Sequence, residues 1–94
     1  MMENIRIHLW IHGKVQGVVF RDSTVTHAKR LGVTGFVRNV QYESMVEAVF
    51  EGPRDKVEKL VEWCSQGSPE ARVDKVEKKE EQYTGEFEDF RIAF

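Results

Sequence analysis

The chain has 94 residues, of which 40% are hydrophobic and 32% are charged, and its formal net charge is −2. This length is too short for two ordinary domains, and the apolar content and small net charge exclude a disordered chain. A dedicated nucleic-acid binder would normally be strongly basic, and no apolar run reaches the ~20 residues that a membrane span needs. We therefore expect a single domain over residues 1–94, with no nucleic-acid partner and no membrane partner.

The single cysteine, Cys64, excludes an internal disulfide, a CxxC redox pair and a cysteine-rich zinc site. The N-terminus also lacks the basic stretch followed by an apolar stretch that marks a secretory signal. A free cysteine suits a reducing compartment, so we expect a cytoplasmic protein.

Hydrophobic periodicity predicts the elements in chain order. Residues 6–12 alternate strictly between apolar and polar, which predicts a strand that ends at Gly13. A helix is predicted from Asp22 to Leu31, with Gly32 as its C-terminal cap. Two apolar, β-branched segments at 33–40 and 45–51 predict strands, and the i, i+3, i+4, i+7 spacing after Pro53 predicts an amphipathic helix that contains Cys64. The remaining strands are expected over 71–83 and 90–94.

This order, β-α-β-β-α-β with a terminal strand, predicts an α+β fold of the ferredoxin-like, split βαβ type. Such a fold is an antiparallel sheet with two helices on one face. Its first two strands run parallel with the third strand between them, so their carboxyl ends lie at the same end of the sheet. The loop after the first strand is therefore expected close to Arg38 and Asn39.

The segment 13–21 joins a strand to a helix and contains Gly13 and Gly17. Glycines let backbone N–H groups face inward, and a helix N-terminus beside them favours an anion. Arg21 at that N-terminus is disfavoured by the helix dipole by roughly 0.3–1 kcal/mol unless an anion lies nearby, and a guanidinium binds phosphate through two parallel hydrogen bonds. By themselves these features still favour an ordinary loop with a surface arginine, and neither nucleotide-binding glycine pattern is present.

The complete string is more specific than these features. Residues 13–21, Gly-Lys-Val-Gln-Gly-Val-Val-Phe-Arg, resemble the acylphosphatase signature: a glycine, then Val-Gln-Gly-Val, one free position and Phe-Arg. Residues 35–39, Gly-Phe-Val-Arg-Asn, resemble the second signature of that family, and the resemblance spans nearly the whole chain. The segment 40–44 departs from the family, because it lacks the frequent Asp-Gly turn and is one residue longer.

The resemblance implies hydrolysis of the mixed anhydride of a carboxylic acid and phosphate, with no cofactor and no metal. It implies that Arg21 and backbone N–H groups of the loop bind the phosphate, and that Asn39 positions the attacking water. The loop residues are Gln16, Gly17, Val18, Val19 and Phe20. Phosphoryl transfer needs mainly positioning and charge stabilisation, which such a site supplies. Neither Arg21 nor Asn39 titrates near neutrality, so we expect kcat to change little between about pH 5 and 8.

Two other functions are compatible with a fold of this type. A non-catalytic phosphate-binding module of the same fold is the main alternative, and it would be favoured if Arg21 or Asn39 were missing. RNA-recognition domains share the topology but expose aromatic side chains on the central strands, whereas residues 45–51 are acidic and lack that signature. His8 and His12 are separated by about 13 Å along a strand, too far to share a metal ion. We expect a monomer that acts on a small acyl phosphate.

Overall fold

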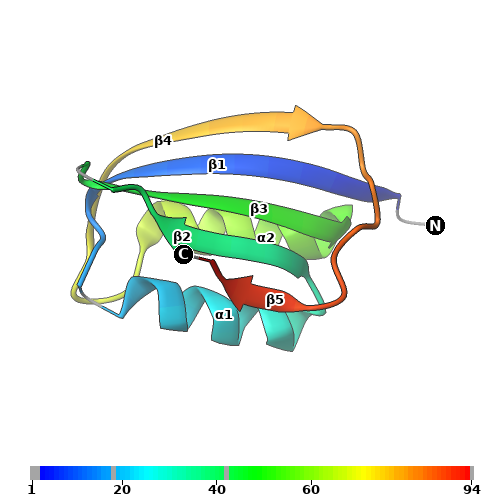
Figure 1. Cartoon of the computed structure of the whole chain (residues 1–94), viewed down its shortest axis with the longest axis horizontal. Helices are drawn as coiled ribbons and strands as arrows, with labels where there is room; N and C mark the ends of the chain where they lie inside the picture. Colours follow the sequence, from blue (N-terminus) through cyan, green and yellow to red (C-terminus); the bar gives the residue numbers. More distant parts are fainter. Residues whose placement is uncertain (1–2, 18, 42, 94) are drawn as a thin grey trace.

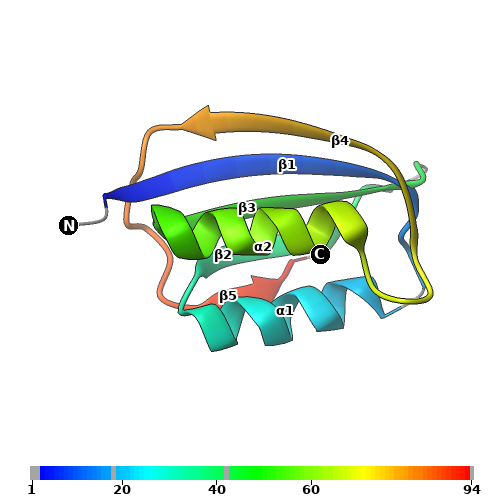
Figure 2. The ribbon, with the colours of Figure 1, turned by 180° about the vertical axis from the view of Figure 1, so that it is seen from behind.

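The computed structural model describes residues 3–17, 19–41 and 43–93. The elements follow the predicted order: β1 (Asn4–Lys14), α1 (Phe20–Leu31), β2 (Thr34–Asn39), β3 (Met45–Pro53), α2 (Arg54–Gln66), β4 (Arg72–Glu81) and β5 (Phe90–Ile92). The strands form one sheet in the order β4-β1-β3-β2-β5, and both helices cover the same face (Figures 1 and 2). The predicted α+β ferredoxin-like fold is confirmed. Among the helices described, none is both long and apolar enough to cross a membrane.

The sheet is mixed rather than purely antiparallel. β3 runs antiparallel to both β1 and β2, and β4 runs antiparallel to β1, as predicted. β5 pairs in parallel with β2, because the chain leaves β4 at one side of the sheet, crosses the end of the sheet and returns on the other side (Figure 1). The antiparallel description therefore holds for the four longer strands.

The core lies between the sheet and the two helices. Alternate residues of β1, from Ile5 to Ile11, are buried on the helix face, as the period of two predicted. Val57, Leu60 and Cys64 of α2 are also fully buried. Cys64 is thus a core residue, as expected, and burial raises the pKa of its thiol.

The first strand and the first helix differ from the prediction at their junction. β1 continues past Gly13 to Lys14 through a register shift between His12 and Gly13. Gly13 has a φ of 134°, and a Cβ there would collide with the carbonyl oxygen of Arg72, so the glycine marks a bulge and not a strand end. α1 begins at Phe20, two residues earlier than predicted, and ends at Leu31 with Gly32 as its C-terminal cap, as predicted.

The strand register brings two distant segments together. His12 of β1 lies opposite Met45, and Asn39 of β2 lies opposite Val46. β1 and β2 therefore finish on either side of the start of β3. The 15–19 loop and the 40–44 turn meet at this end of the sheet, at the left of Figure 1, which we call the loop end. The predicted proximity of the first loop to the end of β2 is confirmed.

The face of the sheet away from the helices carries a network of ion pairs. Arg38 Nε donates to Glu47 at 2.6 Å, and His8 Nε2 lies 2.6 Å from the other oxygen of Glu47. His8 Nδ1 lies 3.1 Å from Glu81, and the ring of His8 stacks on Trp10 with centroids 4.0 Å apart. We call this surface the open face. Arg38 belongs to it and so points away from the face that Asn39 shares with the helices, as expected for neighbours on a strand.

Glu51 lies at the far end of the open face and is fully buried, with 0% of its surface exposed. Its carboxylate accepts hydrogen bonds from Arg6, from the backbone N–H and hydroxyl of Thr84, and from the N–H of Gly85. Burial raises the pKa of Glu51, but the bonds from Thr84, Arg6 and Gly85 outweigh burial and hold the pKa below its usual value. Glu51 therefore fastens the connection between β4 and β5 to the sheet.

Candidate active site

A hollow of about 250 Å³ lies where the 15–19 loop enters α1. The residues that line it come from the loop and from the first turn of the helix: Val15, Gly17, Val19, Phe20, Arg21 and Asp22. Four of the predicted site residues thus meet around one cavity. Val18 was also predicted for this site, and it falls outside the described residues.

The backbone of this loop is in the left-handed conformation at two positions. Gly17 has a φ of 74°, which glycine adopts freely, and Val19 has a φ of 53°, which a β-branched residue adopts only at a cost of about 1–3 kcal/mol. Val19 is the N-cap of α1, and no side chain caps the helix there. The first N–H groups of α1 therefore have no partner within the helix.

Three N–H groups of the loop are also available. Among the described residues, the N–H groups of Gln16, Gly17 and Val19 donate to no backbone carbonyl outside the regular elements. Free N–H groups followed by an uncapped helix N-terminus form an arrangement that binds anions through hydrogen bonds and the helix dipole. Asp22, which no sequence signal assigned to the site, also lines the hollow.

Arg21 differs from most arginines of the chain in having no partner. Each of the following binds a carboxylate: Arg6, Arg38, Arg54, Arg72 and Arg91. Within the described part of the chain, Arg21 makes neither an ion pair nor a side-chain hydrogen bond. Its guanidinium is free to bind a phosphate beside the hollow.

Asn39 ends β2 at the loop end and carries an unsatisfied polar atom. Its Oδ1 is buried and has no hydrogen-bond partner in the described structure. A buried acceptor left without a donor costs about 1–3 kcal/mol, and such an atom is a candidate for binding a water or ligand. Asn39 does not itself line the hollow, but its neighbour Val40 lies within hydrogen-bond distance of the loop residue Gln16.

Two of the predicted loop residues use their side chains elsewhere. Phe20 is buried and stacks on Trp63, with ring centroids 5.5 Å apart, so only its backbone is available to a ligand. The amide of Gln16 points to the 40–44 turn and donates to carbonyl oxygens there. Sequence reasoning missed this bond, because it joins positions at least 24 residues apart and follows no periodic pattern.

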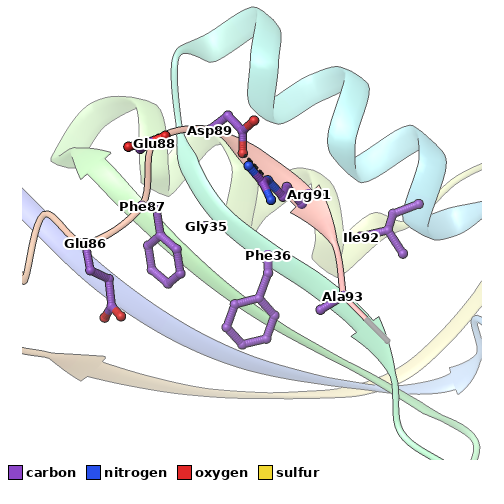
Figure 3. Close-up of a pocket in the computed structure, with 9 residues that line it drawn as sticks. All are labelled: Gly35, Phe36, Glu86, Phe87, Glu88, Asp89, Arg91, Ile92 and Ala93. Atoms are coloured by element: carbon purple, nitrogen blue, oxygen red, sulfur yellow. Dashed lines mark hydrogen bonds and ion pairs between the residues drawn. The ribbon is translucent and has the colours of Figure 1, made fainter.

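A larger hollow, of about 530 Å³, lies beside β2 and β5 and contains none of the predicted site residues. The rings of Phe36 and Phe87 lie side by side in it, with centroids 6.0 Å apart (Figure 3). Two of its carboxylates are already paired: Glu86 binds Arg6 at 2.8 Å and Asp89 binds Arg91 at 2.9 Å. Among the described residues it offers neither a free cation nor a buried polar side-chain atom without a partner, so the loop end is the stronger candidate for chemistry on an anion.

Comparison with known proteins agrees with this choice. The family model described as Acylphosphatase matches residues 7–92. The chain is 58% identical over 91 residues to an acylphosphatase of Pyrobaculum islandicum, an alignment that covers 97% of this chain and 96% of the relative. The chain belongs to the acylphosphatase family.

Solved structures of acylphosphatases have the same fold. The structure from Coxiella burnetii superposes with a TM-score of 0.89 at 39% identity, covering 96% of this chain and 93% of that one. The structure from Bacillus subtilis gives a TM-score of 0.90 at 28% identity, with 96% and 99% covered. The family resemblance inferred from the two signatures is thereby confirmed.

Proposed function

We propose that this chain hydrolyses acyl phosphates to a carboxylate and inorganic phosphate, and that the loop end is its active site. Three polar features of the described residues support the assignment: the free N–H groups of Gln16, Gly17 and Val19, the unpaired Arg21 and the Oδ1 of Asn39 that lacks a hydrogen-bond partner. The single observation that carries it is that the two segments that carry these features meet at the loop end, where Gln16 donates to the carbonyl oxygen of Val40, the residue after Asn39. On the open face, by contrast, Glu47 is paired with both His8 and Arg38.

In this proposal, Arg21 and the loop N–H groups hold the phosphoryl oxygens and stabilise the charge on them in the transition state. The side-chain amide of Asn39 holds a water, with Oδ1 accepting a hydrogen bond from it. The water oxygen bonds to phosphorus, the bond from phosphorus to the acyl oxygen breaks, and its electron pair leaves with the carboxylate. The water proton passes to solvent or to the phosphate produced. A carboxylate is a good leaving group, so the step needs no strong general acid.

The test is release of acetate and phosphate from acetyl phosphate, with and without a chelator, over pH 5 to 8. We expect turnover that the chelator does not change and that varies little with pH, since the proposed step uses no histidine or carboxyl side chain as an acid or base. Binding of phosphate without turnover would favour the non-catalytic module. Turnover abolished by the chelator would contradict a metal-free reaction.

We also propose that the enzyme acts as a cytoplasmic monomer on a small substrate, without nucleic acid. Of the described residues, the large apolar side chains that are exposed are Val19 and Tyr83. Val19 lies in the candidate site and Tyr83 in the connection after β4, so they do not form one patch. Light scattering after size-exclusion chromatography should give the mass of one chain, and a dimer mass would overturn this proposal.

A further inference from the structure

The side-chain amide of Gln16 joins the two segments that form the candidate site. Its Nε2 lies 2.8 Å from the carbonyl oxygen of Glu43, 2.8 Å from that of Met45 and 3.1 Å from that of Val40. All three acceptors belong to the 40–44 turn or to the residue that follows it. The side-chain amide of Gln16 thus faces three backbone carbonyl oxygens of residues 40–45.

These contacts reach the backbone beside Asn39. Val40 directly follows Asn39, and the carbonyl oxygen of Met45 that accepts from Gln16 also accepts from the N–H of Val40 at 3.1 Å. Asn39 itself lies opposite Val46 in the β2–β3 ladder. The amide of Gln16 therefore binds the backbone on both sides of the turn: at Val40, directly after Asn39, and at Met45, the first residue of β3.

A second contact fastens the same two segments. The N–H of Gly13 donates to the carbonyl oxygen of Ser44 at 3.0 Å. Gly13 and Gln16 thus both bind the 40–44 turn to the segment that leads into α1. The hydrogen bond within the turn, from the N–H of Glu43 to the carbonyl oxygen of Val40, is longer, at 3.3 Å.

We propose that Gln16 is a positioning residue for the reaction, which sets the distance between the phosphate-binding loop and the amide of Asn39. This inference rests on the proposed function. The side chain of Gln16 does not touch substrate, because its donors are occupied by the turn. It acts through Asn39: when its contacts are lost, the loop still binds phosphate, but the water is held at the wrong distance from phosphorus.

The decisive variant is Gln16→Met, which has a similar length and no hydrogen-bond donor. A misplacement of about 1 Å can cost 10²-fold in rate, so we expect kcat to fall about 10- to 100-fold. The inhibition constant for inorganic phosphate should change by less than about threefold, since Arg21 and the loop N–H groups remain. The matched control is Gln41→Met, because Gln41 is an exposed glutamine of the same turn. It should keep the wild-type kcat.

A double-mutant cycle separates positioning from a merely structural role. In an Asn39→Ala background there is no amide left to position, so Gln16→Met should lower the remaining kcat by less than about threefold. If Gln16→Met keeps the wild-type kcat, or if its loss is the same in both backgrounds, the proposal is overturned. Failure of the proposed function would be distinct, because the wild type and Gln41→Met would then show no turnover at all.

Gln16→Glu gives an independent readout if Gln16→Met does not fold. A neutral carboxyl can donate one hydrogen bond to the turn, whereas a carboxylate is repelled by the three carbonyl oxygens. We expect kcat of this variant to rise at least threefold from pH 8 to pH 5, while the wild type changes little. A flat profile in the variant would also overturn the proposal.

Discussion

The open face of the sheet and the loop end differ in whether their polar groups have hydrogen-bond or ion-pair partners. At the open face, Arg6 binds Glu51, Glu81 and Glu86, and Glu47 is shared by His8 and Arg38. At the loop end, Arg21 and the Oδ1 of Asn39 have no partner within the described structure, and Val19 holds a left-handed backbone.

The contrast separates charges that hold the fold from charges available for chemistry. A buried polar group without a partner destabilises the fold, and such groups are retained where a bound ligand supplies the missing hydrogen bond. The paired groups of the open face should therefore govern stability, and the unpaired groups of the loop end should govern activity.

The largest effect is expected for Arg21→Ala. Loss of an arginine that stabilises a transferring phosphoryl group costs about 10³- to 10⁵-fold in kcat. Inhibition by phosphate should weaken as well, and Arg21→Lys should also fail, because an ammonium cannot reproduce the planar fork of the guanidinium. Steady-state hydrolysis of acetyl phosphate measures both effects. Arg30→Ala, at an exposed arginine in the last turn of the same helix, is the control and should keep the wild-type rate.

Asn39→Ala should come next. Removing one preorganised polar group from a site of this kind costs about 10²- to 10³-fold in kcat. The inhibition constant for phosphate should stay close to that of the wild type, because the anion contacts Arg21 and the loop. Asn4→Ala, at an exposed asparagine at the start of β1, serves as the control. Near-normal turnover of Asn39→Ala would remove its proposed role in holding the water.

Glu51→Ala tests the other side of the comparison. It leaves Arg6 without its buried partner and removes the acceptor of Thr84 and Gly85, so we expect a loss of about 3–5 kcal/mol in the free energy of unfolding. Urea denaturation measures the loss. Glu86→Ala removes a more exposed partner of the same arginine and should cost less than about 1 kcal/mol. Below its unfolding transition, Glu51→Ala should keep the wild-type affinity for phosphate, and a large loss of affinity would break the division of roles.

The smallest expected effect is a loss of stability at low pH. Hydrogen bonds and ion pairs outweigh burial at Glu47 and Glu51 and hold both pKa values below the usual 4.5 in the folded chain. A folded-state pKa below the unfolded value contributes stability that is present above pH ~4.5 and is lost as the pH falls through the folded value. The urea midpoint should therefore fall steadily below about pH 4.5. In Glu51→Gln the midpoint should be lower at pH 7 but fall less steeply in acid, and an equal slope would show that Glu51 does not contribute.

Much of this division could be predicted from the sequence, and some of it could not. The alternation in β1 and the helical spacing in α2 predicted the elements, and their order predicted that Asn39 and the first loop share one end of the sheet. Burial of Glu51 was not predictable, because on an alternating strand it falls on the polar face. It is buried only because Thr84 and Gly85, more than 30 residues later, cross over it.

The sequence indicated which residues belong to the candidate site, but not the hydrogen bonds that position them. The two signatures led to Arg21 and Asn39, but not to the amide of Gln16, whose acceptors are backbone atoms of a distant turn. Backbone carbonyls carry no sequence signal. The left-handed Val19 was equally hidden, since a β-branched residue is the least expected there and only the surrounding fold holds it.

The most direct test of the division between the two regions is a titration of the ¹⁵N-labelled protein with inorganic phosphate, followed residue by residue by NMR. We predict that the largest shifts fall on the backbone amides of residues 16–21 and on the side-chain amide of Asn39. Glu47 and Glu51 of the open face should not shift. Largest shifts on the open face, or no saturable shift at the loop end, would contradict the account.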